Sequence, residues 1–273
     1  MELNTIGVVG AGVMGSGVAQ VSAAAGYFAV VQDTDDSALE RAKSGIESIS
    51  EKDLEAAMGR IQYTTELEKA CQDADLVVEA VFEDLGVKQE LFEKIEQIAG
   101  PDAILASNTS ALPITEIASV SDRADKIIGI HFMNPVPLMK GVEIIRGQLT
   151  SDETFETALD YIRSLGKEPI PAVDYAGFIV SRLVDVLMNE AVKMVQEGNR
   201  PEDIDKAMEM CAGHPMGPCK LLDLVGAEIA MHGMQTMARD FGDGYKPHHL
   251  LKKRVLAGLL GRKTGRGFYD YKP

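Results

Sequence analysis

A glycine-rich turn close to the amino terminus has the spacing of a site that binds the phosphates of a dinucleotide. Gly10, Gly12 and Gly15 form a G-x-G-x-x-G pattern, which includes Met14 and directly follows the apolar run at residues 6–9. In this pattern the first glycine allows a tight turn, the second lets the backbone approach a pyrophosphate, and the third lets a helix pack closely on a strand. The free amide groups at the start of that helix would bind the pyrophosphate.

An acidic residue after the second apolar run favours NAD over NADP. Asp33 follows Gly15 by 18 residues, at the end of a predicted strand over residues 28–31. A carboxylate at this place can accept hydrogen bonds from the adenosine ribose hydroxyls, whereas it would repel a 2′-phosphate. Asp35 and Asp36 add to that repulsion. The glycine pattern taken alone would also allow FAD.

His131 is the residue whose type best suits proton transfer near neutral pH. It directly follows the apolar run at residues 127–130. We therefore expect it at the carboxyl end of a strand, where ligands of open α/β sheets bind. A lone histidine is more often structural than catalytic, so its role depends on the residues around it.

Strand-like and helix-like segments alternate over the first 174 residues. The short apolar runs expected to be buried strands are at residues 6–9, 28–31, 76–78, 104–106 and 127–130. Helical patterns lie between them, such as residues 87–98, where Leu91, Ile95 and Ile98 share one face. This alternation predicts an α/β fold that begins with a Rossmann-type, doubly wound parallel sheet.

The sequence becomes helical from about Asp174 onward. The helical patterns cover residues 178–197, 204–210, 221–237 and 249–259. We predict a dinucleotide-binding domain over residues 1–174 and an all-helical C-terminal domain over residues 175–273. The first of these helices has an apolar face that is wide enough for both a core and a subunit interface, so we expect a homodimer. That face consists of Val180, Leu183, Val184, Leu187, Met188, Ala191 and Val195.

Composition excludes several other classes of protein. A net charge of −15 argues against nucleic acid as a partner, although residues 246–266 hold seven Lys or Arg and no acid, and could receive an anionic ligand. No apolar run approaches the roughly 20 residues of a membrane helix, and no signal peptide is recognised. The three cysteines fit a reducing compartment, so the cytoplasm is expected. Neither they nor the histidines have metal-ligand spacing, so no metal is expected.

Several motifs together resemble the 3-hydroxyacyl-CoA dehydrogenase family, which includes the short-chain (S)-3-hydroxybutyryl-CoA dehydrogenases. The resemblance runs nearly from end to end of the chain. The motifs that carry it are Glu79-Ala80-Val81 with Glu83 and Lys88, Ser107-Asn108-Thr109-Ser110, the run from His131 to Met139 with Glu143, Pro215-Met216-Gly217-Pro218, and residues 261–269. The resemblance implies reversible NAD-dependent oxidation of a short-chain (S)-3-hydroxyacyl-CoA, with 3-hydroxybutyryl-CoA as the expected substrate.

The resemblance also implies roles for individual residues. His131 would be the general base that takes the proton from the 3-hydroxyl, and Glu143 would orient its ring. Ser110 and Asn134 would position the substrate and the nicotinamide. Further cofactor contacts would come from Met14, Glu83, Lys88, Asn108 and Lys263. The helical domain would close over the acyl chain as well as form the dimer.

Three features depart from the pattern of the family. Ser181 stands where the family typically has asparagine, close to the catalytic histidine. Gly141 replaces an apolar residue and is expected to loosen the strand that carries Glu143. The segment at residues 43–59 is shorter than the family's helical hairpin, whose basic residues meet the CoA nucleotide. Its acidic residues oppose Lys43 and Lys52, so no CoA contact is predicted there.

The sequence is also compatible with two alternative functions. The short segment on the CoA side motivates a dehydrogenase that acts on a free hydroxy acid or sugar acid. Ser181 and Gly141 motivate a paralogue that binds NAD(H) without catalysis.

Overall fold

The computed structural model describes residues 3–47 and 57–271. The chain divides into two compact units, Met1–Tyr175 and Ala176–Pro273. No helix in these described ranges has the length and apolarity needed to cross a lipid bilayer.

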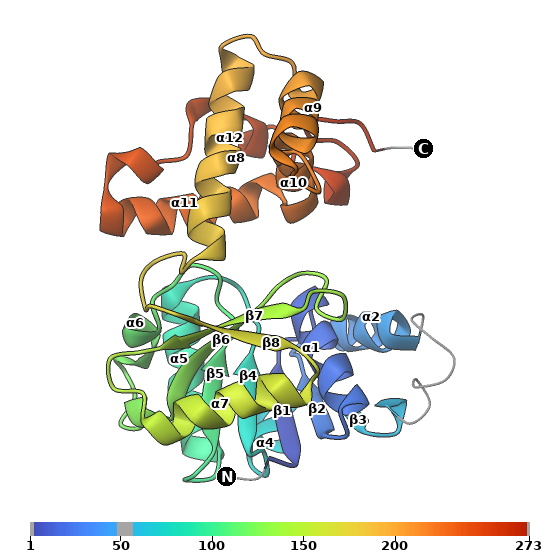
Figure 1. The fold of residues 1–273 in the computed structure, drawn as a ribbon. Coiled ribbons are helices and arrows are strands. Elements are labelled where there is room, and N and C mark those ends of the chain that lie inside the picture. Colours follow the sequence, from blue (N-terminus) through green and yellow to red (C-terminus); the bar gives the residue numbers. More distant parts are fainter. Residues whose placement is uncertain (1–2, 48–56, 272–273) are drawn as a thin grey trace. The chain divides into compact units, whose positions relative to one another are not determined.

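The first unit contains an eight-stranded sheet with the order β3-β2-β1-β4-β5-β6-β7-β8 (Figure 1). The strands are β1 (Thr5–Val9), β2 (Phe28–Gln32), β3 (Ile61–Thr64), β4 (Leu76–Glu79), β5 (Ile104–Ser107), β6 (Ile127–Phe132), β7 (Gly141–Arg146) and β8 (Glu168–Ala172). All neighbouring strands are parallel except β6 and β7, which are antiparallel. The strand order reverses between β1 and β4, and such a switch point is where open α/β sheets bind ligands.

Helices cover both faces of this sheet. They are α1 (Val13–Ala24), α2 (Asp36–Glu47), α4 (Leu67–Cys71), α5 (Leu85–Ile98), α6 (Ile114–Ala118) and α7 (Asp152–Ser164). One core cluster joins α1, α2 and α7 to one face of the sheet. On the other face, Gly7 of β1 lies against Ala70 of α4, and Gly129 of β6 lies against Ile114 of α6. The predicted Rossmann-type fold class is therefore confirmed, with β7 and β8 running opposite to the other strands of the sheet.

The buried face of α5 differs from the expected one. Phe92 and Ile95 are fully buried together with Lys88, whereas Leu91 and Ile98 are only half-buried. The expected face of Leu91, Ile95 and Ile98 rested on apolar residues alone, and a buried lysine does not enter such a pattern. Lys88 can be buried here because it pairs with Glu79, which lies at the end of β4.

The second unit is helical. Its helices are α8 (Val180–Gln196), α9 (Pro201–Ala212), α10 (Pro218–Val225), α11 (Ala227–Phe241) and α12 (His249–Leu256). The single helix expected over residues 221–237 is wrong, because α10 and α11 are separated at Gly226. That glycine has a φ of 104°, which interrupts helical geometry. The last helix is also shorter than expected and ends before Gly258, which has a φ of 72°.

Candidate active site

The glycine-rich turn connects β1 to α1 at the switch point of the sheet. Gly10 has a φ of 104°, and a Cβ there would lie 2.6 Å from the carbonyl oxygen of Ala80. A Cβ at Gly15 would overlap the carbonyl oxygen of Gly10. Only glycine at this position therefore lets α1 pack so closely on β1. A Cβ at Gly12 would meet no atom within 4 Å. The backbone of Gly12 is therefore open to a ligand, beside the start of α1.

Asp33, which follows the end of β2, stabilises this turn through hydrogen bonds. Its Oδ2 accepts a hydrogen bond from the backbone N–H of Ala11 at 2.9 Å, and its Oδ1 accepts one from the N–H of Asp35 at 3.0 Å. A carboxylate has about four lone-pair positions, so these bonds leave acceptor capacity for ribose hydroxyls. The residue therefore has the position and the chemistry expected of the acidic cofactor contact.

His131 and Glu143 form a buried pair on β6 and β7. The two residues are register partners on the antiparallel strands, and His131 Nδ1 lies 2.8 Å from Glu143 Oε2. Only 4% of His131 and 1% of Glu143 are exposed. Gly141, at the start of β7, still pairs with Glu168 of β8, and a Cβ there would lie 3.0 Å from the side chain of Ile170. β7 is therefore paired along its whole length, including at Gly141.

The loop after β5 connects to the strand that carries His131. The side-chain oxygen of Asn108 accepts a hydrogen bond from the backbone N–H of Phe132 at 2.9 Å. Ser110 lies two residues further along and is partly exposed. Asn134 is exposed in the segment between β6 and β7, where its peptide bond to Pro135 is cis. These three polar residues thus follow the carboxyl ends of β5 and β6, and His131 is the last residue but one of β6.

Glu83 and Lys88 are held in protein contacts below this loop. Glu83 Oε1 accepts hydrogen bonds from Thr109 Oγ1 at 2.6 Å, from the N–H of Ser110 at 2.8 Å and from the N–H of Ala111 at 2.9 Å. Burial by itself raises the pKa of Glu83, but the charge of Lys88 and these hydrogen bonds outweigh it, so the pKa is lowered. Lys88 is 1% exposed, and its ammonium lies between Glu79 and Glu83. The buried Glu79 is a residue for which the sequence indicated no functional role.

Three of the seven basic residues in the stretch at residues 246–266 pair with acids of the second unit. Lys263 pairs with Glu228, Lys246 with Asp243 and Arg266 with Asp270. Two arginines of the stretch also lie over aromatic rings, Arg254 over Phe268 and Arg262 over Tyr271. The acidic partners lie outside the stretch in sequence, so a window over residues 246–266 overstates its free positive charge.

The other predicted features have the following places. Ser181 lies half-buried in the first turn of α8. Most of the short segment on the CoA side, including Lys52, lies outside the described residues. Among the residues that are described, no three His, Cys, Asp or Glu side chains are grouped so that they could hold a metal ion.

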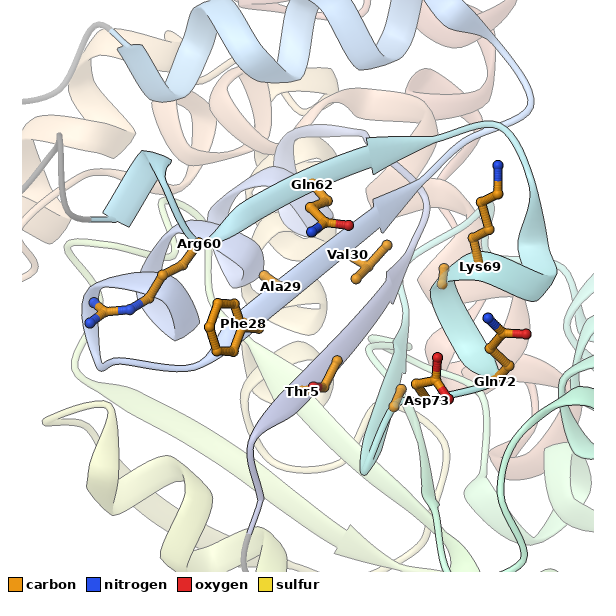
Figure 2. A pocket seen from close by; sticks show the side chains of 11 residues that line it. Thr5, Phe28, Ala29, Val30, Arg60, Gln62, Lys69, Gln72 and Asp73 are labelled. Carbon is orange, nitrogen blue, oxygen red and sulfur yellow. The ribbon is translucent and has the colours of Figure 1, made fainter.

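A separate hollow lies at the opposite edge of the sheet (Figure 2). Thr5 and Phe28, at the amino ends of β1 and β2, line it together with Arg60 and Lys69. Ligands of open α/β sheets bind at the carboxyl ends of the strands. We therefore assign no catalytic role to this hollow.

Comparisons with known proteins identify the family of the chain. The sequence profile described as "3-hydroxyacyl-CoA dehydrogenase, NAD binding domain" matches residues 5–175, and that of the C-terminal domain of the same enzymes matches residues 177–271. The chain is 46% identical to a "Probable 3-hydroxybutyryl-CoA dehydrogenase" of Deinococcus radiodurans, over 97% of this chain and 99% of that protein.

Two solved structures are similar over 100% of both chains, each at 38% identity. They are FadB2 of M. tuberculosis, with a TM-score of 0.92, and the (S)-3-hydroxybutyryl-CoA dehydrogenase PaaH1 from Ralstonia eutropha, with a TM-score of 0.90. The resemblance found in the sequence is thereby confirmed. The chain belongs to the 3-hydroxyacyl-CoA dehydrogenase family, and it is an oxidoreductase whose cofactor is NAD.

Proposed function

We propose that this enzyme catalyses the reversible oxidation of a short-chain (S)-3-hydroxyacyl-CoA to the 3-oxoacyl-CoA, with 3-hydroxybutyryl-CoA as its substrate. The observation that carries the proposal is the buried pair of His131 and Glu143. This pair lies at the same edge of the sheet as the glycine-rich turn. Relatives named 3-hydroxybutyryl-CoA dehydrogenase support the choice of substrate.

The chemistry assigned to the pair is a proton transfer coupled to a hydride transfer. NAD supplies the hydride acceptor, at C4 of its nicotinamide. His131 takes the proton of the 3-hydroxyl as the hydride leaves C3, and in the reductive direction it returns that proton to the oxygen. Because Nδ1 faces Glu143, the proton is exchanged through Nε2. Glu143 fixes the ring orientation, as carboxylates do for catalytic histidines elsewhere.

The proposed cofactor contacts fall into two groups. Gly10, Gly12, Met14 and Gly15 hold the pyrophosphate over the start of α1, and Asp33 binds the adenosine ribose. Asn108, Ser110 and Asn134 position the nicotinamide and the substrate. Lys263, from the helical unit, is proposed as a further contact to the cofactor. Glu83 and Lys88 belong to the same site through the loop that they support.

We assign dinucleotide binding to residues 1–174, and substrate binding and dimerisation to residues 175–273. Several apolar side chains of α8 support a homodimer because they remain exposed on the unit, among them Leu183 (69%) and Val186 (42%). The three cysteines are free thiols, which fits the proposal that the enzyme acts in the cytoplasm.

The deciding experiment measures the loss of NADH absorbance with acetoacetyl-CoA. Parallel reactions contain NADPH in place of NADH, or free acetoacetate in place of the thioester. We expect turnover with NADH and the thioester only. Turnover of free acetoacetate without the thioester would instead indicate a free hydroxy acid as the substrate. No turnover with either compound would contradict the proposal.

A further inference from the structure

A buried cluster of charges lies under the loop that follows β5. Glu79, the last residue of β4, is 0% exposed, and Lys88 of α5 is 1% exposed. Lys88 Nζ lies 2.6 Å from Glu79 Oε1 and 3.4 Å from Glu83 Oε2. One ammonium therefore joins two carboxylates, one at the end of β4 and one in the segment between β4 and α5.

Glu79 holds the beginning of this loop through both its side chain and its backbone. Its Oε2 accepts a hydrogen bond from Ser107 Oγ at 2.7 Å, and its carbonyl oxygen accepts one from the N–H of Asn108 at 2.8 Å. Its Oε1 also accepts the N–H of Val81 at 2.7 Å. The carboxylate thus fixes the place where the chain leaves β5.

Glu83 holds the rest of the loop through Thr109, Ser110 and Ala111. The carboxylates of Glu79 and Glu83 are thus the two anchors of the loop. Lys88 lies between them and fixes the distance that separates them. Asn108 in turn accepts the backbone N–H of Phe132, the residue after His131. The cluster is therefore connected by hydrogen bonds to the strand that carries the proposed general base.

Stability alone does not explain this cluster. Removing charged groups from water costs several kcal/mol for each ion, and replacing a buried ion pair with apolar residues is often neutral or stabilising. A fully hydrogen-bonded buried network does, however, define one geometry more sharply than apolar packing does. The cluster lies below the candidate active site and not elsewhere in the core. This location indicates that the cluster fixes the geometry of that site.

We propose that Glu79 is a positioning residue of this enzyme, which acts by anchoring the loop of Ser107, Asn108 and Ser110 through Ser107 and Lys88. This inference rests on the function proposed above, in which the loop contacts nicotinamide and substrate. Glu79 itself is buried and touches neither of them. Lys88 is the counter-charge that keeps the two anchoring carboxylates together.

The test compares Glu79→Gln with Asp75→Asn. Asp75 precedes β4 at the opposite edge of the sheet, and its carboxylate also accepts backbone amides, those of Asn4 and Thr5. We expect Glu79→Gln to lower kcat on acetoacetyl-CoA by about 10²-fold, since a displacement of about 1 Å can have that effect. The dissociation constant of NADH should change less than about threefold, because the glycine-rich turn is intact. Asp75→Asn should leave kcat within about twofold of wild type even where its Tm falls.

A second variant and a second measurement keep the test independent of folding and of activity. Ser107→Ala removes only the hydroxyl that Glu79 binds and should lower kcat in the same direction, by about tenfold. In both variants we expect faster amide hydrogen exchange over residues 107–112, and unchanged exchange over β1. Wild-type kcat and exchange in both variants would overturn the role of Glu79. An inactive wild type would overturn the proposed function, while the exchange measurement would still decide whether Glu79 anchors the loop.

Discussion

His131 and Glu143 are direct partners across the antiparallel strands β6 and β7, and their side chains meet at 2.8 Å. β7 is the strand that breaks the parallel sheet, so the pairing depends on this reversal. In antiparallel strands, opposed residues place their side chains on the same face of the sheet. Strand register therefore brings His131 and Glu143, which are twelve positions apart in the sequence, into one site.

The first prediction concerns this pair. Glu143→Gln retains an acceptor for the Nδ1–H of His131 but removes the negative charge that stabilises the protonated ring. We expect kcat to fall by about 10²-fold, with the affinity for NADH nearly unchanged. Steady-state kinetics and a fluorescence titration with NADH measure the two quantities. Glu168→Gln, on the exposed start of the neighbouring strand β8, is the matched control. Equal kcat values for the two variants would contradict the role of Glu143.

The second prediction concerns cofactor choice. Asp33→Asn removes the charge that repels a 2′-phosphate and weakens the acceptor for ribose hydroxyls and for the N–H of Ala11. Hydrogen bonds to charged groups contribute about 1.5–3 kcal/mol, so the dissociation constant of NADH should rise by about tenfold or more. The preference for NADH over NADPH should narrow at the same time.

Asp35→Asn is the comparison for that experiment. The carboxylate of Asp35 bonds to Ser37 and pairs with Arg41, and it makes no bond to the glycine-rich turn. Asp35→Asn should therefore change the ratio of NADH to NADPH use much less than Asp33→Asn does. A wild-type ratio of NADH to NADPH use in Asp33→Asn would show that another residue sets the cofactor choice.

The parts of the fold that were predictable have local signals. Parallel strands buried on both faces appear as short apolar runs, and all six residues of β6 are buried. The glycine-rich turn was predictable because its spacing follows from steric limits at Gly10 and Gly15. The family's motifs then identified His131 and Glu143, whose pairing no local pattern could reveal.

The parts that were not predictable depend on tertiary contacts or on a single torsion angle. Lys88 is buried because it pairs with Glu79 and Glu83, and a charged residue does not mark a buried face in a hydrophobic period. The break between α10 and α11 at Gly226 has no signal in the neighbouring sequence, because no proline lies beside it and a single glycine is tolerated within a helix. The charge of Lys263 looked available because its partner Glu228 lies 35 residues earlier.

The third prediction concerns assembly. Leu183 on α8 is 69% exposed and belongs to the apolar face proposed as the subunit interface. Leu183→Asp would place a charge in that interface, so we expect a monomer in light scattering where the wild type is a dimer. Leu149 in the first unit is also 69% exposed, and Leu149→Asp should remain dimeric. A dimeric Leu183→Asp would place the interface on another surface.

The fourth prediction concerns the pH dependence of stability. Asp185 of α8 is 7% exposed and faces α11, where a Cβ at Gly233 would lie 2.6 Å from Asp185 Oδ2. Burial raises the pKa of Asp185 from 3.8 to about 7. Between these values the unfolded chain loses the proton while the folded chain keeps it, so stability falls as the pH rises. The full penalty, about 4 kcal/mol at most, is present above pH 7.

Asp185→Asn removes this titration without changing the size of the side chain. The difference in unfolding free energy between the variant and the wild type should therefore increase by a few kcal/mol from about pH 4 to about pH 8, in favour of the variant. Urea unfolding at the two pH values measures it. Glu190→Gln changes an exposed acid on the same helix, which pairs with Lys193, and the difference between this variant and the wild type should hardly vary with pH. A pH-independent difference for Asp185→Asn would contradict the prediction, because it would mean that Asp185 ionises in the folded protein as readily as in the unfolded chain.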